Sequence, residues 1–441
     1  MSTIVRDWSW VKLGECVAMN EATYKPKEAW PFVNYLDTGS ITDNRIKAIQ
    51  HLELSKDELP SRARRKVRPG DIVFSTVRPN QRHFGLLRDI PENFLVSTGF
   101  AVMRARENIA DAGFLYWFLS QEKIVGQLHT IAEHSTSAYP SIRPADIEGL
   151  EVNLPSTSEQ RAIARVLGAL DDKIELNRRM NETLEAMARA IFKDWFVDFG
   201  PTRAKAEGRA PYLPPELWNL FPAALKNSVL GEIPDEKRWK VGVLADIVEI
   251  LSGGTPKTSV LQYWDGGIPW YTAKDAPSLS DVFVLATERT VTQAGIDNSA
   301  AKVLPARTTT ITARGTVGRL ACLGVPMAMN QTCYGIRGAH GHPDFFTYWN
   351  VRATVDKLRQ RTHGTIFDTI TRQTFKLVET ALPPLELAKA FESVVTGLME
   401  RILKNLHESS ILAETRDLLL PKLMSGELRL RDAGRAVEAV A

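Results

Sequence analysis

The stretch SEQRAIARVLGALDDKIELN, residues 158–177, opens a heptad pattern that continues to Trp195 and decides the organisation of the chain. Its seam positions alternate between spacings of four and three residues. They are Ile163, Leu167, Leu170, Ile174, Asn177, Asn181, Leu184, Ala188, Ile191 and Trp195. A helix with an apolar repeat of about 3.5 residues coils around a partner helix. The stretch therefore predicts one helix of a coiled coil.

The partner lies in the same chain, because the pattern returns 228 residues later. The second seam consists of Phe391, Val395, Leu398, Ile402, Asn405, Ser409, Leu412, Arg416, Leu419 and Leu423. Asn177 is matched by Asn405, and a buried seam asparagine fixes register and pairing at a cost in stability. We therefore expect the two helices to pair with each other. We also expect Pro421 to end or kink the second helix, because proline removes a backbone donor.

The repeat extends upstream of both helices. Residues 96–104 match residues 329–337 at an offset of 233, and residues 67–78 match residues 303–314 at an offset of 236. The second match aligns Arg78 with Arg314. Such duplication predicts two similar halves, each a globule followed by a helix. A pseudo-two-fold object suits a partner with two-fold symmetry, such as duplex DNA.

These patterns predict an α+β fold with two mixed α/β domains related by pseudo-two-fold symmetry. Two long antiparallel coiled-coil helices are expected to separate them. The expected boundaries are a first domain at 1–155, a first helical region at 156–200, a connector at 201–238, a second domain at 239–382, a second helical region at 383–426 and a C-terminal tail at 427–441. A capping box, Ser156-x-x-Glu159, marks the start of the first long helix. A shorter helix is expected from Asp111 to Gln127.

Composition narrows the class of protein. The chain has 441 residues, a net charge of +3 and no apolar run of about 18 residues that would span a membrane. The first residues contain no apolar segment of the secretory kind. Cys16, Cys322 and Cys333 are odd in number and lack metal-ligand spacing. We therefore expect a cytoplasmic protein without disulfides.

Basic residues gather at corresponding places in the two halves. The first segment contains only one acidic residue, Asp71, among Arg62, Arg64, Arg65, Lys66, Arg68, Arg78, Arg82 and Arg88. The second contains no acidic residue among Lys302, Arg307, Arg314 and Arg319. One basic stripe can be a solvated surface, but its recurrence favours binding to DNA phosphates.

Motifs for catalysis are missing from the sequence. GGTPK at 253–257 lacks the spacing of a phosphate loop, and Pro256 removes an amide donor that such a loop needs. There is no glycine-rich dinucleotide fingerprint and no adenine-methyltransferase tetrapeptide. His340, His342 and Asp344 form a short cluster that is more typical of a polar loop than of a metal site. We expect a chain without catalysis, cofactor or metal of its own.

Two segments have the composition of base-reading elements. TARGTVG at 312–318 combines glycines, which permit close backbone approach, with an arginine that can bind guanine bidentately. Its counterpart at 76–85 keeps an arginine in a different loop. Asn330 and Gln331 suit adenine, although a buried hydrogen-bonded pair is an equal alternative. The candidate DNA-binding residues are Arg62, Arg64, Arg65, Lys66, Arg68, Ser75, Arg78, Arg82, His83, Gly254, Thr255, Lys257, Lys274, Thr312, Arg314, Gly315, Thr316, Asn330 and Gln331.

Four segments together resemble a known family. The central conserved region of this family is similar to residues 158–177, and its distal conserved end is similar to LPKLMSG at 420–426. Its target-recognition motifs are similar to two pairs of segments, 252–257 with 268–270 and 314–318 with 330–331. Over essentially its whole length the chain resembles the specificity (S) subunit of type I restriction-modification systems, which act in host defence.

The resemblance implies two target-recognition domains, each reading one half of a split DNA site, with the helices as a ruler. It also implies two DNA methyltransferase subunits that use S-adenosylmethionine, and restriction (translocase/nuclease) subunits that use ATP and magnesium. The sequence departs from the pattern in two places. The first domain has Ser97-Thr98 where the second has Asn330-Gln331, and the second helix opens LELAK at 385–389 without Ser-Glu-Gln.

Two other functions compete with this interpretation. One is an enzyme, a DNA methyltransferase or nuclease with unrecognised motifs, which would modify DNA without partners. The other is a scaffold whose globules bind protein only, which would show no salt-dependent binding to DNA.

Overall fold

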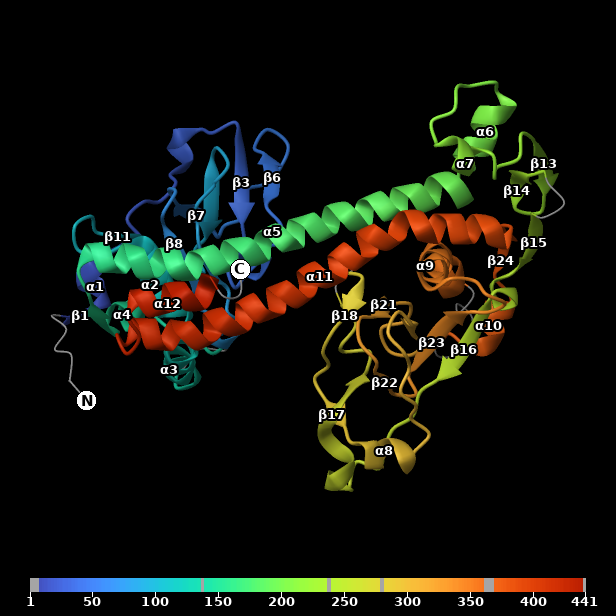
Figure 1. The fold of residues 1–441 in the computed structure, drawn as a ribbon. Helices are drawn as coiled ribbons and strands as arrows, with labels where there is room; N and C mark the ends of the chain where they lie inside the picture. Colours follow the sequence, from blue (N-terminus) through green and yellow to red (C-terminus); the bar gives the residue numbers. More distant parts are fainter. Residues whose placement is uncertain (1–7, 136–138, 236–238, 278–280, 361–368, 439–441) are drawn as a thin grey trace. The chain divides into compact units, whose positions relative to one another are not determined.

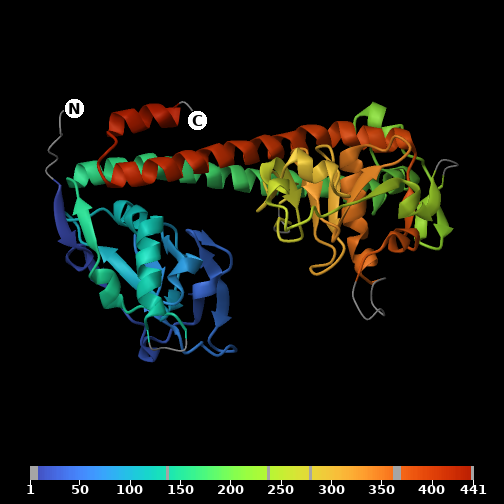
Figure 2. The ribbon, with the colours of Figure 1, turned by 90° about the horizontal axis from the view of Figure 1, so that it is seen from below.

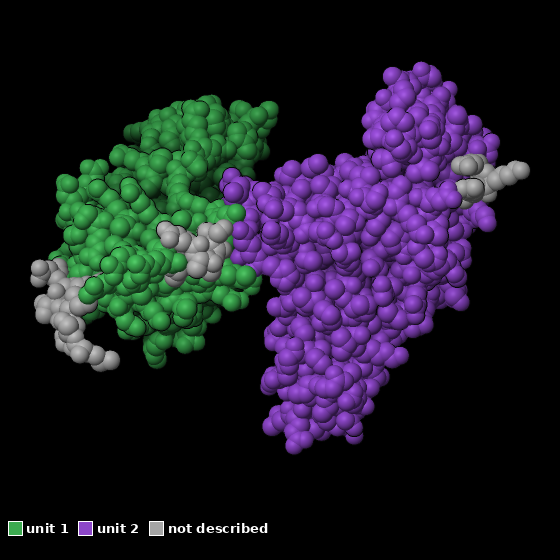
Figure 3. All heavy atoms as spheres, in the orientation of Figure 1, with its two compact units in different colours: residues 1–174, 410–441 green, residues 175–409 purple. Residues whose placement is uncertain are grey.

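The computed structural model describes residues 8–135, 139–235, 239–277, 281–360 and 369–438. The chain forms two compact units, one of residues 1–174 with 410–441 and the other of residues 175–409 (Figure 3). Each unit contains one mixed α/β domain and one part of each long helix. The predicted α+β class is therefore confirmed.

Two helices of 40 residues each, α5 (Thr157–Phe196) and α11 (Leu385–Met424), run side by side (Figures 1 and 2). The Ser156 hydroxyl accepts the backbone N–H of Glu159 at 3.3 Å, as the capping box predicts.

Pro421 was expected to end or kink the second helix; the first alternative is wrong, and the kink stays a prediction. Pro421 lies inside α11, which continues to Met424. Leu419 and Leu423 on either side of the proline are both buried. Proline inside a helix removes one backbone hydrogen bond, and the burial of these leucines offsets that cost in the last turn.

The two helices are antiparallel and meet through polar as well as apolar seam residues. In the second unit, Asn177 Nδ2 donates to Glu408 Oε2 at 2.8 Å and Asn405 Nδ2 donates to Asn181 Oδ1 at 2.9 Å. In the first unit, an ion pair of 2.6 Å joins Arg416 to Asp171. The predicted antiparallel pairing within one chain is confirmed.

Most of the predicted seam residues are buried. Ile163, Leu167, Leu170, Asn177, Phe391, Val395, Ile402, Asn405, Leu412 and Leu419 are buried, whereas Ile174, Leu184, Ile191 and Leu398 are half-buried. The first unit has an aliphatic seam core. The second has an aromatic one, in which Phe391 contacts Phe192 and Trp195 at ring-centroid distances of 5.4 and 6.1 Å.

The domain of the first unit contains two four-stranded sheets. One has the order β2 (Val17–Met19), β11 (Phe100–Ala105), β8 (Ile72–Ser75) and β9 (Phe84–Leu86); the other has the order β6 (Gln50–Glu53), β3 (Phe32–Leu36), β10 (Phe94–Ser97) and β7 (Ala63–Lys66). A further pair joins β1 (Ser9–Lys12) to β12 (Glu151–Leu154), and β4 (Ile41–Thr42) pairs β5 (Arg45–Ile46). The short helices are α1 (Leu13–Cys16), α4 (Pro144–Glu148) and α12 (Leu430–Glu438).

The helix expected from Asp111 to Gln127 is two helices, α2 (Ala112–Ser120) and α3 (Glu122–Glu133). Gln121 between them is extended, with ψ of 135°. The break lets both helices bury apolar faces in the domain core, which one straight helix would not do.

The domain of the second unit repeats this plan. Its larger sheet has the order β16 (Val248–Ser252), β23 (Cys333–Gly338), β20 (Thr309–Thr312), β21 (Leu320–Leu323) and β18 (Phe283–Val284); the smaller has the order β19 (Thr290–Val291), β17 (Trp264–Tyr271) and β22 (Ala328–Met329). A pair joins β15 (Lys240–Val243) to β24 (Glu379–Leu382). The helices are α8 (Gln293–Asp297), α9 (Asp344–Gln360) and α10 (Arg372–Lys376).

The segment expected to be a connector, 201–238, contains local structure. It includes most of α6 (Gly200–Ala206), then α7 (Pro215–Trp218) and a hairpin of β13 (Leu225–Ser228) with β14 (Gly231–Pro234). Phe221 and Ile233 of this segment join the aromatic core of the second unit.

A charge cluster on α5 generates a pH prediction. Glu175 accepts hydrogen bonds from Arg178 and Arg179, which lowers the pKa of its carboxyl from 4.5 to about 2. The folded-state pKa is below the unfolded one, so this stabilisation is complete above pH 4.5 and disappears as the pH falls towards 2. Glu175→Gln should therefore flatten the loss of unfolding free energy over this range, measured by circular dichroism in denaturant.

Glu182→Gln is the matched control. Glu182 accepts from the same Arg178 at 2.5 Å and is more exposed than Glu175. Equal acid profiles for the two variants would contradict the assignment to Glu175.

Candidate nucleic-acid interface

Equivalent turns follow equivalent strands in the two domains. Thr76 N donates to Gly99 O at 2.8 Å after β8, and Ala313 N donates to Thr332 O at 2.8 Å after β20. The backbone N–H of Ile142 then donates to Thr76 O, as that of Ile370 does to Ala313 O. Thr76 therefore corresponds to Ala313.

This correspondence corrects the sequence alignment by one residue. Arg314 matches Val77, and Arg78 matches Gly315. The backbone agrees, because Arg78 and Gly315 both have positive φ, of 48° and 78°. A threonine and an arginine occur at the same spacing in both loops, and matching them gave an alignment that is shifted by one residue. The strand pairing gives the correct alignment, because it depends on backbone hydrogen bonds.

Arg314 lies at an exposed turn that the preceding threonine holds in shape. The Thr312 hydroxyl donates to Thr316 O and accepts Arg319 N at 2.9 Å, and it is buried. Gly315 and Thr316 are exposed beside Arg314. Among the described residues no ion pair or hydrogen bond holds the Arg314 guanidinium. It is therefore available to a ligand.

Arg78 is the exposed arginine of the other turn. Its backbone N–H donates to Pro140 O at 2.9 Å, and its guanidinium lies 5.3 Å from the ring centre of Tyr139, which is itself exposed. A left-handed backbone is strained for arginine, and such strain often accompanies a functional position. The pair presents a cation and an aromatic face together.

Hydroxyl and amide groups meet at a second place in the later domain. The Thr255 hydroxyl donates to Gln331 Oε1. Asn330 Oδ1 accepts from Thr332 N at 3.0 Å and from its hydroxyl at 2.7 Å, so Asn330 shapes a turn. Gln331 is exposed, whereas Asn330 is half-buried. Gln331 is thus the better placed of the two amides for contact with a base.

Gly253 and Gly254 position these groups by close backbone packing. A Cβ at Gly254 would lie 2.3 Å from Ala301 N, and a Cβ at Gly253 would lie 2.1 Å from Asn330 O. Trp270 Nε1 donates to Gly254 O at 3.0 Å. Gly254 therefore brings Thr255 beside Gln331.

Several predicted DNA-binding residues have partners inside the first domain. Arg82 pairs with Asp43 at 2.6 Å and Glu122 at 3.2 Å. His83 Nδ1 hydrogen-bonds to Ile41 O at 2.6 Å, and Lys66 forms an ion pair with Glu28. The hydroxyl of buried Ser75 donates to Val77 O at 2.9 Å and accepts Val77 N at 3.2 Å. These side chains help to hold the domain together.

Other predicted residues are available at the surface. Arg62, Arg68, Lys257 and Lys274 are exposed. Lys274 is 3.9 Å from Glu288, and Arg64 Nε donates to Ser61 O at 3.3 Å. Arg65 is half-buried, and desolvation lowers the pKa of its guanidinium.

The structure adds one cation that the sequence analysis missed. Arg289 is exposed and lies 3.6 Å from the ring centre of Trp264, whose indole N–H donates to Lys257 O at 3.3 Å. Arg289 is therefore placed near predicted Lys257. It follows Glu288 in the sequence and lies outside both basic segments, so nothing in the pattern pointed to it.

The titratable clusters carry ordinary structural roles. Asp344 pairs with Arg337 at 3.3 Å, and His342 Nδ1 hydrogen-bonds to Ala339 O at 2.7 Å. Within the described ranges no group of three or more His, Cys, Asp or Glu side chains could hold a metal ion.

Burial raises the pKa of Cys16 to about 11 and that of Cys333 to about 12, so these thiols are protonated at neutral pH. No helix in the described part of the chain is both long and apolar enough to cross a membrane.

The architecture matches a family whose members determine DNA specificity. The family model described as type I restriction modification DNA specificity domain matches residues 6–186 and 236–408, which together are most of the chain. The chain belongs to this family. It is a DNA-recognition protein of type I restriction-modification systems.

Individual relatives match nearly the whole length of the chain. The HindI specificity subunit of Haemophilus influenzae is 27% identical, over 96% of this chain and 100% of the relative. The MjaIX specificity subunit of Methanocaldococcus jannaschii is 23% identical, over 97% and 95%. The crystal structure of a type I restriction-modification S subunit from M. genitalium has a similar fold, with a TM-score of 0.58 at 15% identity over 96% of this chain and 97% of that one.

The packing at Gly254 generates a prediction with a matched control. Gly254→Ala places a methyl group within overlap distance of the Ala300–Ala301 backbone, which must shift. We expect it to lower the unfolding free energy of the second domain by about 1–3 kcal/mol, as overpacking does. Gly267→Ala meets no atom within 4 Å and should be neutral. Similar denaturant midpoints for the two variants would contradict the packing role.

Proposed function

We propose that this chain is the non-catalytic, sequence-reading subunit of a type I restriction-modification complex, with each domain reading one half of a split DNA site. One observation carries the proposal. The same strand–turn–strand, fixed by the same backbone hydrogen bonds, presents an exposed arginine in each domain, Arg78 in one and Arg314 in the other.

The two domains offer different groups to the DNA. The second has Arg314 for guanine and Gln331 for adenine or a sugar-phosphate contact. The first has Ser97 at the place of Asn330, and this serine is buried with its hydroxyl accepting Gly99 N at 3.3 Å. Different side chains on one scaffold would read different half-sites.

The helices would set the spacing between the half-sites and dock two DNA methyltransferase subunits. S-adenosylmethionine would belong to those subunits, and ATP with magnesium to restriction subunits with translocase and nuclease activity. Family membership and the relatives named as specificity subunits support this division of labour.

Arg314→Ala and Arg78→Ala test whether the two exposed turns contact bases. Each should weaken DNA binding of the complex assembled with its methyltransferase by about 1–3 kcal/mol, because a bidentate contact to a base is lost. Each should also relax selectivity in one half-site only. Binding to an array of half-site variants at several salt concentrations measures both effects.

Lys404→Ala, an exposed lysine on α11, is the control for loss of charge. Unchanged affinity and unchanged half-site preference in both arginine variants would show that these turns do not read bases. Absence of salt-dependent DNA binding by the unmodified complex would favour a protein scaffold.

Matched heptad insertions test the ruler. The pairs Asn177–Ser409 and Asp171–Arg416 place Lys173 opposite Ala413 and Glu414. Seven residues inserted after Lys173 and seven after Ala413 would extend both helices by about 10 Å and keep the contact of Asn177 with Asn405. We expect the spacer of the methylated site to become about three base pairs longer, because each base pair rises by about 3.4 Å. Single-molecule sequencing of genomic adenine methylation measures it.

An insertion in only one helix is the control, because it breaks the seam and should abolish methylation. An unchanged spacer with both helices extended would show that something other than the helices sets the distance.

A further inference from the structure

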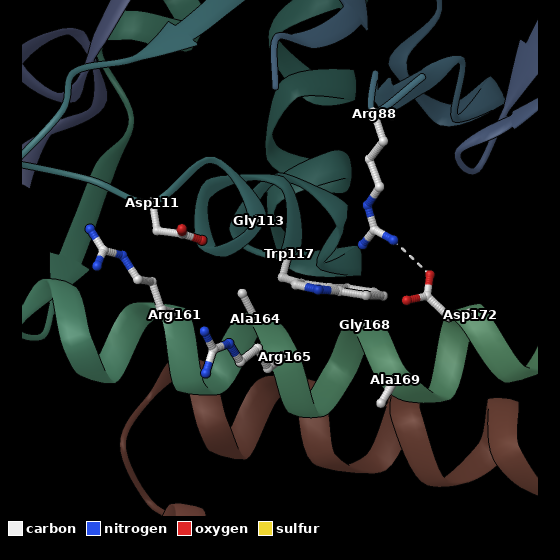
Figure 4. Close-up of a pocket in the computed structure, with 10 residues that line it drawn as sticks. All are labelled: Arg88, Asp111, Gly113, Trp117, Arg161, Ala164, Arg165, Gly168, Ala169 and Asp172. Carbon is white, nitrogen blue, oxygen red and sulfur yellow. Dashed lines mark hydrogen bonds and ion pairs between the residues drawn. The ribbon is translucent and has the colours of Figure 1, made fainter. Parts of the chain in front are cut away.

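The first unit contains a cavity of about 500 Å³ between α2 and α5 (Figure 4). Its floor is made by residues with little or no side chain and by one indole. They are Gly113, Trp117, Ala164, Gly168 and Ala169. Figure 4 shows the Trp117 ring lying along α5. Apart from the indole N–H, these five lining residues have no polar side-chain group.

Close packing keeps the cavity in place. A Cβ at Gly113 would lie 3.0 Å from that of Ala164, so α2 and α5 approach closely there. Asp111 caps α2 by accepting Phe114 N at 3.0 Å. Its own N–H donates to Gln160 Oε1 at 2.8 Å, and Gln160 is fully buried. The two walls therefore form one rigid piece.

Three arginines surround the floor. Arg88 occupies one end, where it pairs with Asp172 at 2.6 Å. Arg161 and Arg165 lie one turn apart on the exposed side of α5. Within the described residues no acceptor is assigned to either of these two guanidiniums. The guanidiniums of Arg161 and Arg165 at the rim can therefore both donate hydrogen bonds to a ligand, beside lining residues that are largely apolar.

The second unit fills the equivalent place with its own side chains. Glu392 stands 228 residues after Ala164, and Thr396 stands 228 residues after Gly168. The Glu392 carboxylate accepts Phe345 N at 3.3 Å and Phe346 N at 2.9 Å, and the Thr396 hydroxyl donates to Glu392 O at 2.6 Å. Joining a domain to a long helix thus does not require an open groove.

We propose that the groove of the first unit is a docking site for an acidic segment of a protein partner. A carboxylate of the partner binds Arg161 and Arg165, and an apolar neighbour packs on the small residues at the edge of Trp117, which is itself 4% exposed. The inference rests on the proposed function, which makes a methyltransferase subunit the partner. Arginine is among the residues that contribute most at protein interfaces.

The chemistry of the groove favours protein over DNA as the occupant. A phosphate backbone is bound by exposed cations and gains nothing from an apolar floor. A carboxylate side chain matches the planar fork of arginine, and the residue next to it can bury apolar surface. Because Glu392 and Thr396 stand at the positions of α11 that correspond to Ala164 and Gly168, the two methyltransferase subunits would be held by different contacts.

The test is assembly of the full-length chain with its methyltransferase, followed by native mass spectrometry and titration. Arg161→Glu with Arg165→Glu should weaken one of the two binding events by about tenfold or more and leave the other unchanged. The expected product at moderate concentration is a complex with one methyltransferase subunit, where the unmodified chain binds two.

Gly168→Thr is a second variant that closes the groove without altering charge. A Cβ there would be 3.5 Å from Arg88 Nη2, an ordinary contact, so the fold should tolerate it. It should weaken the same binding event. Lys357→Glu with Lys376→Glu, on the second domain, makes the same change in net charge as the double arginine variant and should leave assembly intact.

The outcomes separate the two hypotheses. Failure of the unmodified chain to bind any methyltransferase subunit would overturn the proposed function together with this inference. Full assembly by both groove variants, with unchanged dissociation constants, would overturn the groove inference alone. Unchanged assembly with weaker DNA binding would assign the arginines to phosphate contact and would also overturn it.

Discussion

The structure depends on the antiparallel contact of α5 with α11 at the polar middle of their seam. Asn177 and Asn405 are equivalent residues of the repeat, and the Asn177 amide meets the Asn405 carbonyl at 3.4 Å. Both are buried and both find further partners, Asn181, Glu408 and Ser409. A shift by one heptad would bury these amides without acceptors, which costs about 1–3 kcal/mol for each group. Apolar residues supply the association, and the asparagines select its register.

Each domain is fixed to its long helix at the same place by different chemistry. In the first unit, Gln160 donates to Ile109 O at 3.2 Å and to Pro155 O at 2.9 Å, and it accepts Asp111 N. In the second, Ala388 replaces this glutamine and Glu392, one turn later, accepts the first N–H groups of α9. Burial raises the pKa of Glu392, but the two backbone donors favour its charged form. The second helix lacks Ser-Glu-Gln, and Glu392 takes over the role of the missing glutamine in fixing the domain to the helix.

The recognition turns show how a shared scaffold allows different readings. Strand pairing and the hydrogen bonds of Thr76 and Ala313 are the same in both domains, because they involve backbone atoms that any residue supplies. Side chains beyond those atoms are free to differ. Arg78 rests beside Tyr139 in one domain, while Arg314 stands at a glycine turn in the other. Predicted residues such as Arg82 and His83 are instead engaged in contacts within their own domain.

The sequence by itself determined the duplication, the two long helices, their pairing and the α+β class, because heptad spacing and repeat offsets are local patterns that survive without coordinates. Only the tertiary structure decided the one-residue register between the two turns, the break at Gln121 and the continuation of α11 past Pro421. It also decided which arginines have partners, since Asp43 and Arg82 are distant in sequence and adjacent in space. The sequence could not predict the groove at Gly168. The groove forms where residues with small side chains or none on α2 and α5 face each other, and only folding brings these two helices together.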